Sequence, residues 1–155
     1  MKNQITKNFT LKELTYSDTA YKKNISNIPS EEEYNNMKTL CEEVLQPIRD
    51  HFGKPVRINS CFRCEELNKA VGGAKNSQHR TGQAADIEII GMSNYELAQW
   101  IRDNLEYDQL ILEYANNISQ DKNSGWVHVS FVSKKSNRKQ VLTINNNGTK
   151  LGLYK

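Results

Sequence analysis

Two histidines and one aspartate are the residues of this chain whose types and spacing best suit metal chemistry. His79 and Asp86 lie in residues 77–86, a short polar loop that leads into an apolar strand, and His128 lies in residues 126–130, where apolar and polar residues alternate. Two imidazoles and a carboxylate are the usual protein ligands of a catalytic zinc, with the fourth position left for water. Non-haem iron uses the same donors. Spacing alone equally allows a polar loop residue at 79 and a cross-strand hydrogen-bonding histidine at 128.

The local sequence around these residues favours their convergence. Gly82 allows a turn that brings His79 back over the strand that follows it. Within that strand Ala84 and Asp86 share one face, so a small side chain leaves room for an ion beside the carboxylate. A bound zinc would acidify its water to a pKa of about 7 and polarise a carbonyl group. The pattern therefore predicts a hydrolytic metal site.

Helices and strands that would position this site follow from capping and periodicity. Ser or Thr followed three residues later by Glu predicts helices that begin near residues 10, 30 and 93. Apolar residues at helical spacing extend the second helix to residue 48, where Pro47 is expected to kink or tighten the last turn. We also expect a short helix over 65–71, polar loops over 16–27 and 116–125, and strands over 56–60, 83–90, 109–114, 126–132, 140–144 and 150–154.

This order of elements predicts the fold class. Helices and strands are mixed along the chain, and the late strands are joined by links of hairpin length. We therefore expect an α+β fold in which an antiparallel sheet is covered on one face by helices and carries the metal site on the other. A length of 155 residues fits one domain over residues 1–155.

Charge and composition limit the classes of partner that the chain is expected to bind. The net charge is +3, and the basic cluster at residues 134–139 is expected to be a solvated turn, so nucleic acid is not a predicted partner. Residues 1–8 lack the apolar core of a signal peptide, and no apolar run approaches the length of a bilayer span. We expect synthesis in the cytoplasm without a signal peptide, no membrane partner, and a monomer as the assumed state.

The cysteines and the remaining histidine are expected to take no part in metal binding. An odd number of cysteines, three, argues against a disulfide framework. Cys61 and Cys64 have the spacing of a zinc knuckle, but only Cys41 remains to complete a second pair. Cys41 lies on the apolar stripe of a helix, which predicts a core residue. His51 falls at the end of the same helix, where a capping role is ordinary.

The motifs around the candidate ligands resemble the metal-site signature of the M15 peptidases. They are Ser-x-His-x-x-Gly-x-Ala-x-Asp at residues 77–86 and Trp-Val-His-Val-Ser at residues 126–130. Residues 60–68 are similar to the family's Ser-Gly-Tyr-Arg-Ser-x-x-x-Asn pattern, with Cys61 and Cys64 in place of Gly and Ser. That family includes zinc D-Ala-D-Ala carboxypeptidases and phage endolysin peptidases and shares a fold with the hedgehog signalling domain. The resemblance covers residues 9–132.

The resemblance implies a role for each matched residue. His79, Asp86 and His128 would be the zinc ligands. Arg63 would hold the substrate carbonyl or C-terminal carboxylate and stabilise the developing oxyanion, for which a bidentate guanidinium is well suited. Ser77 would offer its hydroxyl to the peptide or to its own loop. The implied activity is hydrolysis of peptidoglycan stem peptides, as a carboxypeptidase or an endopeptidase.

The general base is where the chain departs from the pattern. Many members of the family have Glu or Asp three residues before the last histidine, and Gly125 occupies that position here. Glu113 is the candidate base, because burial in an apolar strand would raise its pKa. Residues 109–113 also match a Gln-Leu-Ile-x-Glu element of the most similar subgroup. Asp121 is the alternative. Pairing with Arg63, or orienting a ligand histidine, would be the non-catalytic role of Glu113.

Two further expectations concern biological context. A chain of this size without a signal peptide fits a phage or prophage lysin released by a holin, or a component of a phage particle. The missing acid at Gly125 instead favours a non-catalytic module of the same fold that keeps the metal for stability.

Overall fold

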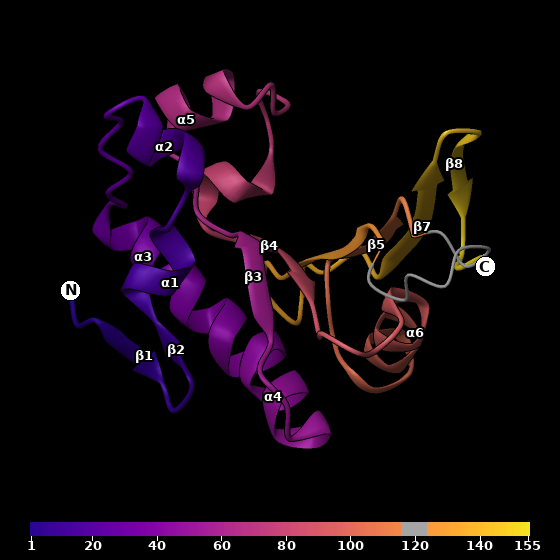
Figure 1. Cartoon of the computed structure of the whole chain (residues 1–155). Helices are drawn as coiled ribbons and strands as arrows, with labels where there is room; N and C mark the ends of the chain where they lie inside the picture. Colours follow the sequence, from indigo (N-terminus) through magenta and orange to yellow (C-terminus); the bar gives the residue numbers. More distant parts are fainter. Residues whose placement is uncertain (116–123) are drawn as a thin grey trace.

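The computed structural model describes residues 1–115 and 124–155 and shows an α+β fold (Figure 1). Its helical elements are α1 (Leu11–Thr15), α2 (Asp18–Lys22), α3 (Glu31–Leu40), the π-helical η1 (Cys41–Leu45), α4 (Gln46–Phe52), α5 (Glu65–Ala70), the 3-10 turn η2 (Gln78–Thr81) and α6 (Asn94–Asn104). Its strands are β1 (Gln4–Thr6), β2 (Phe9–Thr10), β3 (Arg57–Ser60), β4 (Ala84–Glu88), β5 (Gln109–Glu113), β6 (Trp126–Ser130), β7 (Gln140–Asn145) and β8 (Gly148–Leu151).

The main sheet has six strands in the order β3-β4-β6-β5-β7-β8. Its neighbouring strands are antiparallel apart from β5 and β7, which are parallel, so the expectation of an antiparallel sheet is wrong for this pair. The reason is a crossover: after β6 the chain reverses over residues 131–139 and places β7 on the far side of β5. Strands β1 and β2 form a separate antiparallel pair that the sequence pattern did not indicate.

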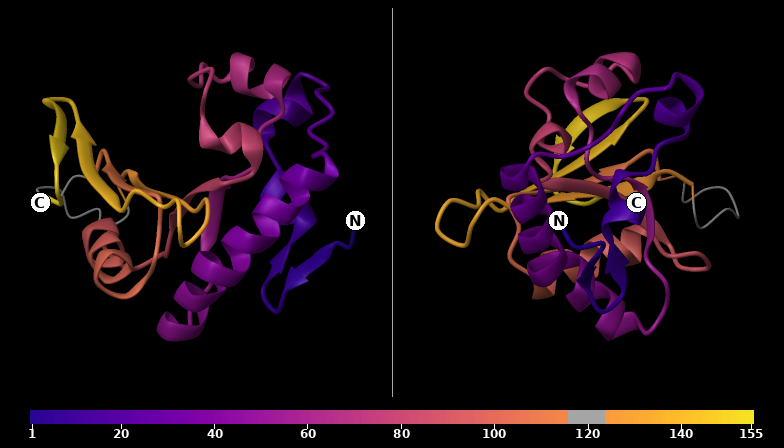
Figure 2. Two further views of the ribbon diagram at one scale, coloured as in Figure 1. Left: turned by 180° about the vertical axis from the view of Figure 1, so that it is seen from behind. Right: turned by 90° about the vertical axis from the view of Figure 1, so that its left-hand side faces the viewer.

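The two faces of the sheet differ because apolar and polar side chains alternate along its central strands. Ala85 and Val129 are paired in register and face the core, and both are fully buried. Asp86 pairs with His128, and His128 pairs in turn with Ile111, so these three share the opposite face. Helices α3, α4 and α6 pack on the core face, whereas η2 and α5 lie on the other side (Figure 2). The predicted division into a helix-covered face and a site face is confirmed.

The long helical segment begins and ends largely as its sequence predicts. Ser30 and Glu33 form a complete capping box at the start of α3, and Gly53, with φ +63°, ends α4. Pro47 cannot donate the hydrogen bond of the preceding turn. Instead of a sharp kink, the helix widens into η1 directly before this proline.

The other capping signals also locate helix starts. Thr10 and Ser93 accept hydrogen bonds from the backbone N–H groups three residues later, at 3.2 and 3.0 Å. Residues 16–27 were expected to be a loop, but they contain α2, whose cap is Ser17. This one-turn helix is too short to show an apolar period, and tertiary contacts must supply its stability. In the described residues, no helix combines the length and apolarity needed to cross a membrane.

A buried aspartate ties the crossover connection to the sheet. Asp108 directly precedes β5 and accepts hydrogen bonds from the backbone N–H of Arg138 at 2.9 Å and from its guanidinium Nη2 at 2.7 Å. The Gln78 amide donates a further bond to Asp108 at 2.9 Å. The basic cluster at 134–139 was expected to be a solvated turn; residues 134–136 do form an exposed turn, and the exposed Arg138 is in addition ion-paired with the buried Asp108.

Acidification from about pH 4 to about pH 2 is expected to remove the stability that Asp108 contributes. Hydrogen bonds from Arg138 lower its folded pKa to about 2, whereas an unfolded aspartate titrates near ~3.9. The contribution is therefore complete above the unfolded pKa and lost as the pH falls through the folded one. Because the Arg138 side chain is 55% exposed, solvent screening should limit it to about 1–2 kcal/mol.

Urea unfolding of wild type and Asp108→Asn at pH 7 and pH 2 measures this contribution. The difference in unfolding free energy between them should shrink at pH 2. Asp103→Asn is the matched control, because Asp103 pairs with Arg102 at the exposed surface. An equal difference at both pH values would contradict the assignment.

Candidate metal centre

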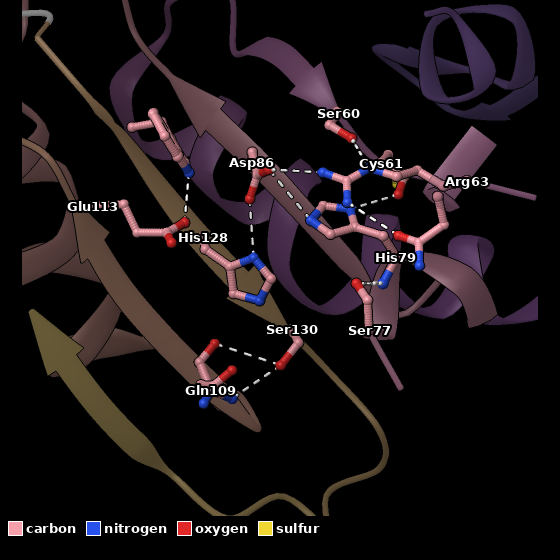
Figure 3. A network of polar contacts seen from close by, with 12 residues as sticks. Ser60, Cys61, Arg63, Ser77, His79, Asp86, Gln109, Glu113, His128 and Ser130 are labelled. Atoms are coloured by element: carbon pink, nitrogen blue, oxygen red, sulfur yellow. Dashed lines mark hydrogen bonds and ion pairs between the residues drawn. The ribbon is translucent and has the colours of Figure 1, made fainter. Parts of the chain in front are cut away.

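The three predicted ligands converge on one point of the site face (Figure 3). Asp86 lies in the middle of β4 with His128 beside it on β6, and η2 brings His79 over the strand. His128 Nδ1 lies 2.9 Å from Asp86 Oδ1, and His79 Nε2 lies 3.3 Å from Asp86 Oδ2. Ligand atoms around a tetrahedral zinc are roughly 3.3–3.5 Å apart, so small side-chain adjustments would seat an ion between them.

His79 is held by its own loop and by a backbone carbonyl. The Ser77 hydroxyl caps η2 by accepting the His79 backbone N–H, and Gly82 ends the turn in the left-handed region with φ +74°. A Cβ on Gly82 would lie 2.6 Å from the carbonyl oxygen of Glu33, so glycine is needed there. His79 Nδ1 lies 2.7 Å from the Cys61 carbonyl oxygen. Because a carbonyl only accepts, Nδ1 carries a proton, and Nε2, which faces Asp86, is the nitrogen that an ion would bind in place of a proton.

The donor chemistry fits a metal ion. In the described ranges, the group that could hold one consists of His79, Asp86 and His128, whose ligand atoms all lie within 4.8 Å of one another. Burial alone would raise the pKa of Asp86, but hydrogen bonds with His128 and His79 outweigh it and hold that pKa well below its usual range. An ionised carboxylate is what a divalent cation requires. Cys61 and His51 are not part of this group.

Arg63 lies at the edge of the triad and is fixed in place. Its Nη2 is 3.7 Å from Asp86 Oδ2, its Nε donates to Ser60 Oγ at 3.0 Å, and its Nη1 donates to Asn68 Oδ1 at 3.3 Å. Burial lowers the pKa of Arg63, although a guanidinium keeps its charge in proteins. A positioned cation beside a metal can stabilise a developing oxyanion.

Glu113 lies on the opposite side of Asp86 from Arg63 in Figure 3. It pairs in register with Trp126, whose indole Nε1 donates to Glu113 Oε2 at 2.5 Å. Burial raises the pKa of Glu113, and the nearby charge of Asp86 raises it further. A carboxyl group whose pKa is moved toward neutrality is suited to proton transfer. Glu113 and the triad line one cleft of about 440 Å³.

Comparison with known proteins identifies the family of this chain. A family model described as Peptidase M15 matches residues 7–130, a range that includes the three candidate ligands, Arg63 and Glu113. The chain belongs to the peptidase M15 family. Over 61 residues it is 41% identical to a zinc D-Ala-D-Ala carboxypeptidase of Streptomyces albus G. That alignment covers 39% of this chain and 24% of the relative, so the chain spans about a quarter of the relative's length.

Packing around Gly125 explains why this M15 chain lacks an acid there. Gly125 has φ +71°, and a Cβ would lie 2.1 Å from the carbonyl oxygen of Glu113. No side chain fits without moving the end of β5. The alternative base, Asp121, lies outside the described residues.

Gly125→Ala is expected to destabilise the protein by about 2–4 kcal/mol, because strain at positive φ adds to a clash with the backbone. Gly53→Ala is the matched control: Gly53 also has positive φ, but a Cβ there meets nothing within 4 Å, so about 1 kcal/mol is expected. Chemical unfolding of both variants measures the difference. Equal losses would contradict the clash.

The cleft of this M15 site contains Ser77, which was predicted, and also residues that were not anticipated. Ser77 lines the cleft, but its hydroxyl caps η2, so a contact with substrate stays a prediction. Gln78 and Arg138 also line the cleft, and neither was singled out from the sequence. The sequence signal for Gln78 was its position directly before His79, a candidate ligand. Arg138 reaches the cleft through the crossover connection, which no local pattern reveals.

Proposed function

We propose that this chain is a zinc-dependent metallopeptidase that hydrolyses peptide bonds in the stem peptides of peptidoglycan. The observation that carries the proposal is the convergence of two imidazoles and one carboxylate within 4.8 Å, with Arg63 and Glu113 beside them in one cleft. Membership of the M15 family and the similarity to a zinc D-Ala-D-Ala carboxypeptidase support both the metal and the substrate class.

Six residues of the cleft would then have distinct tasks. His79, Asp86 and His128 would hold the zinc, which supplies an acidified water and a polarised carbonyl when bound. The Glu113 carboxylate would accept the proton of the attacking water and return it to the leaving nitrogen. The indole of Trp126 would hold Glu113 in place through its hydrogen bond. Arg63 would donate hydrogen bonds to the carbonyl oxygen as negative charge develops there.

The finer parts of the proposal concern substrate and context. The enzyme would act as a carboxypeptidase or an endopeptidase, with Arg63 and Ser77 contacting the peptide. We propose a single M15 domain over residues 1–155. A phage or prophage lysin that reaches the cell wall after holin-type release, or in a phage particle, would use this activity.

Digestion of purified muropeptides, followed by mass spectrometry, tests the proposal. Cleavage products should appear with the zinc-loaded protein, disappear with a chelator and return when zinc is added. The masses of the products identify the bond that is cleaved.

The alternative is a non-catalytic module of the same fold that keeps the metal for stability, favoured by the glycine at position 125. Stoichiometric zinc without cleavage of any stem peptide would support that alternative. Iron rather than zinc after native purification would point to oxygenase chemistry on the same ligands.

A further inference from the structure

Arg138 forms a second cationic site in the cleft, separate from Arg63. Its guanidinium is oriented by Asp108, whose side chain is only 3% exposed, through bonds from Nε at 3.1 Å and from Nη2 at 2.7 Å. Gln78 donates to the same carboxylate at 2.9 Å. Because Gln78 directly precedes His79, the Arg138 pair is connected to the loop that carries a candidate ligand.

The guanidinium pairs with the buried Asp108 carboxylate, but the crossover connection also has a bond to Asp108 that does not depend on the Arg138 side chain. The backbone N–H of Arg138 donates to Asp108, and any residue except proline would provide that bond at this position. The side chain instead adds a charged fork whose Nη1 has no hydrogen-bond partner among residues 1–115 and 124–155. It is 55% exposed and lines the cleft, so donors remain for a ligand.

The register of the strands indicates roughly how far the Asp108–Arg138 pair lies from the triad. The Asp108 backbone N–H donates to the Ser130 carbonyl at 2.8 Å, and Ser130 lies two residues beyond His128 on β6. Two residues of a strand span roughly 7 Å, and both Arg138 and the triad line the same cleft. An extended peptide held at the metal would therefore bring a group two or three residues from the cleaved bond to Arg138.

We propose that Arg138 binds a substrate carboxylate two or three residues from the scissile bond and so makes the enzyme selective for acidic peptides. The inference rests on the proposed peptidase function. A guanidinium with a fixed plane and free N–H groups suits bidentate recognition of a carboxylate. Asp108 has a positioning role, since it orients the fork and does not itself reach the substrate.

Stem peptides in which each carboxylate in turn is replaced by a carboxamide test this selectivity. For the carboxylate at the stated distance, wild type should lose about 10- to 100-fold in kcat/KM on amidation, mainly through KM. Arg138→Gln should cleave the acid and the amide equally, at the rate of wild type on the amide. Lys139→Gln is the matched control, because Lys139 pairs with exposed Glu106 and is not among the cleft residues; it should keep the preference.

Three outcomes would overturn the proposal. The first is an Arg138→Gln variant that keeps the wild-type ratio of acid to amide, and the second is a wild type without any preference. A third is an equal loss on both peptides together with a lower Tm, which would assign Arg138 a structural role. If wild type cleaves none of the peptides, the proposed function fails. Calorimetric titration of the same peptides then decides: the acid should bind wild type more tightly than the amide, and Arg138→Gln should remove that difference.

Discussion

Replacing His128 with alanine is expected to lower kcat/KM by at least about 10³-fold and to remove most of the bound zinc. Three protein ligands are the minimum that catalytic zinc sites use. His128 Nδ1 lies 2.9 Å from Asp86 Oδ1, so its loss leaves one histidine and one carboxylate for the ion. Metal content by mass spectrometry and peptide cleavage measure the two effects together.

His51→Ala is the matched control for this variant. His51 stacks on Trp100 with ring centroids 4.4 Å apart and lies outside the metal group. It should keep full zinc content and activity, although lost packing can lower stability. A His128→Ala protein that cleaves at the wild-type rate would exclude the metal mechanism.

The candidate metal centre could be predicted from the sequence because the relative positions of two of its ligands depend on local structure. His79 and Asp86 are seven residues apart, and a glycine turn followed by an alternating strand fixes their relation. His128 likewise occupies a position of its own strand whose side chain points to the polar face. Pairing of β4 with β6 in the correct register was therefore enough to bring it beside Asp86. Alternation also fixed which face of the sheet would carry the site, because a shift by one residue would bury the polar set.

What the sequence did not reveal depends on long-range pairing. The parallel pair β5–β7 arises because residues 131–139 carry the chain across the sheet, and no local signal distinguishes that path from a hairpin. The same crossover brings Arg138 to Asp108, 30 residues away in sequence. The bond from Trp126 to Glu113 likewise follows from the register of two strands joined through residues 114–125. These long-range contacts determine the positions of cleft residues whose roles composition and periodicity could not predict.

The position of Glu113 also accounts for the glycine that separates this chain from many M15 peptidases. Gly125 packs against the backbone of Glu113 and leaves no room for a side chain. The acid is thus offered from β5 rather than from the segment before β6. Since Trp126 occupies the adjacent position and donates a hydrogen bond to the carboxylate, the two strands together hold the candidate base in the cleft.

Glu113→Gln is accordingly expected to lower kcat by about 10²–10⁴-fold while the zinc stays bound. Glutamine keeps the shape and the contact with Trp126 but cannot accept a proton from water. Burial raises the pKa of Glu113 above its ordinary value. If Glu113 is the base, its ionisation should produce the acidic limb of the wild-type pH–rate profile, and this limb should disappear in the variant.

Glu88→Gln is the matched control, because Glu88 is also a buried strand glutamate and its partner is Arg57, 3.4 Å away and outside the cleft. It should leave kcat and the pH profile unchanged. Normal turnover by Glu113→Gln would transfer the role of base to Asp121. A variant that loses zinc together with activity would instead show that Glu113 supports the ligands. Retained metal with a lost acidic limb is the result that separates proton transfer from both alternatives.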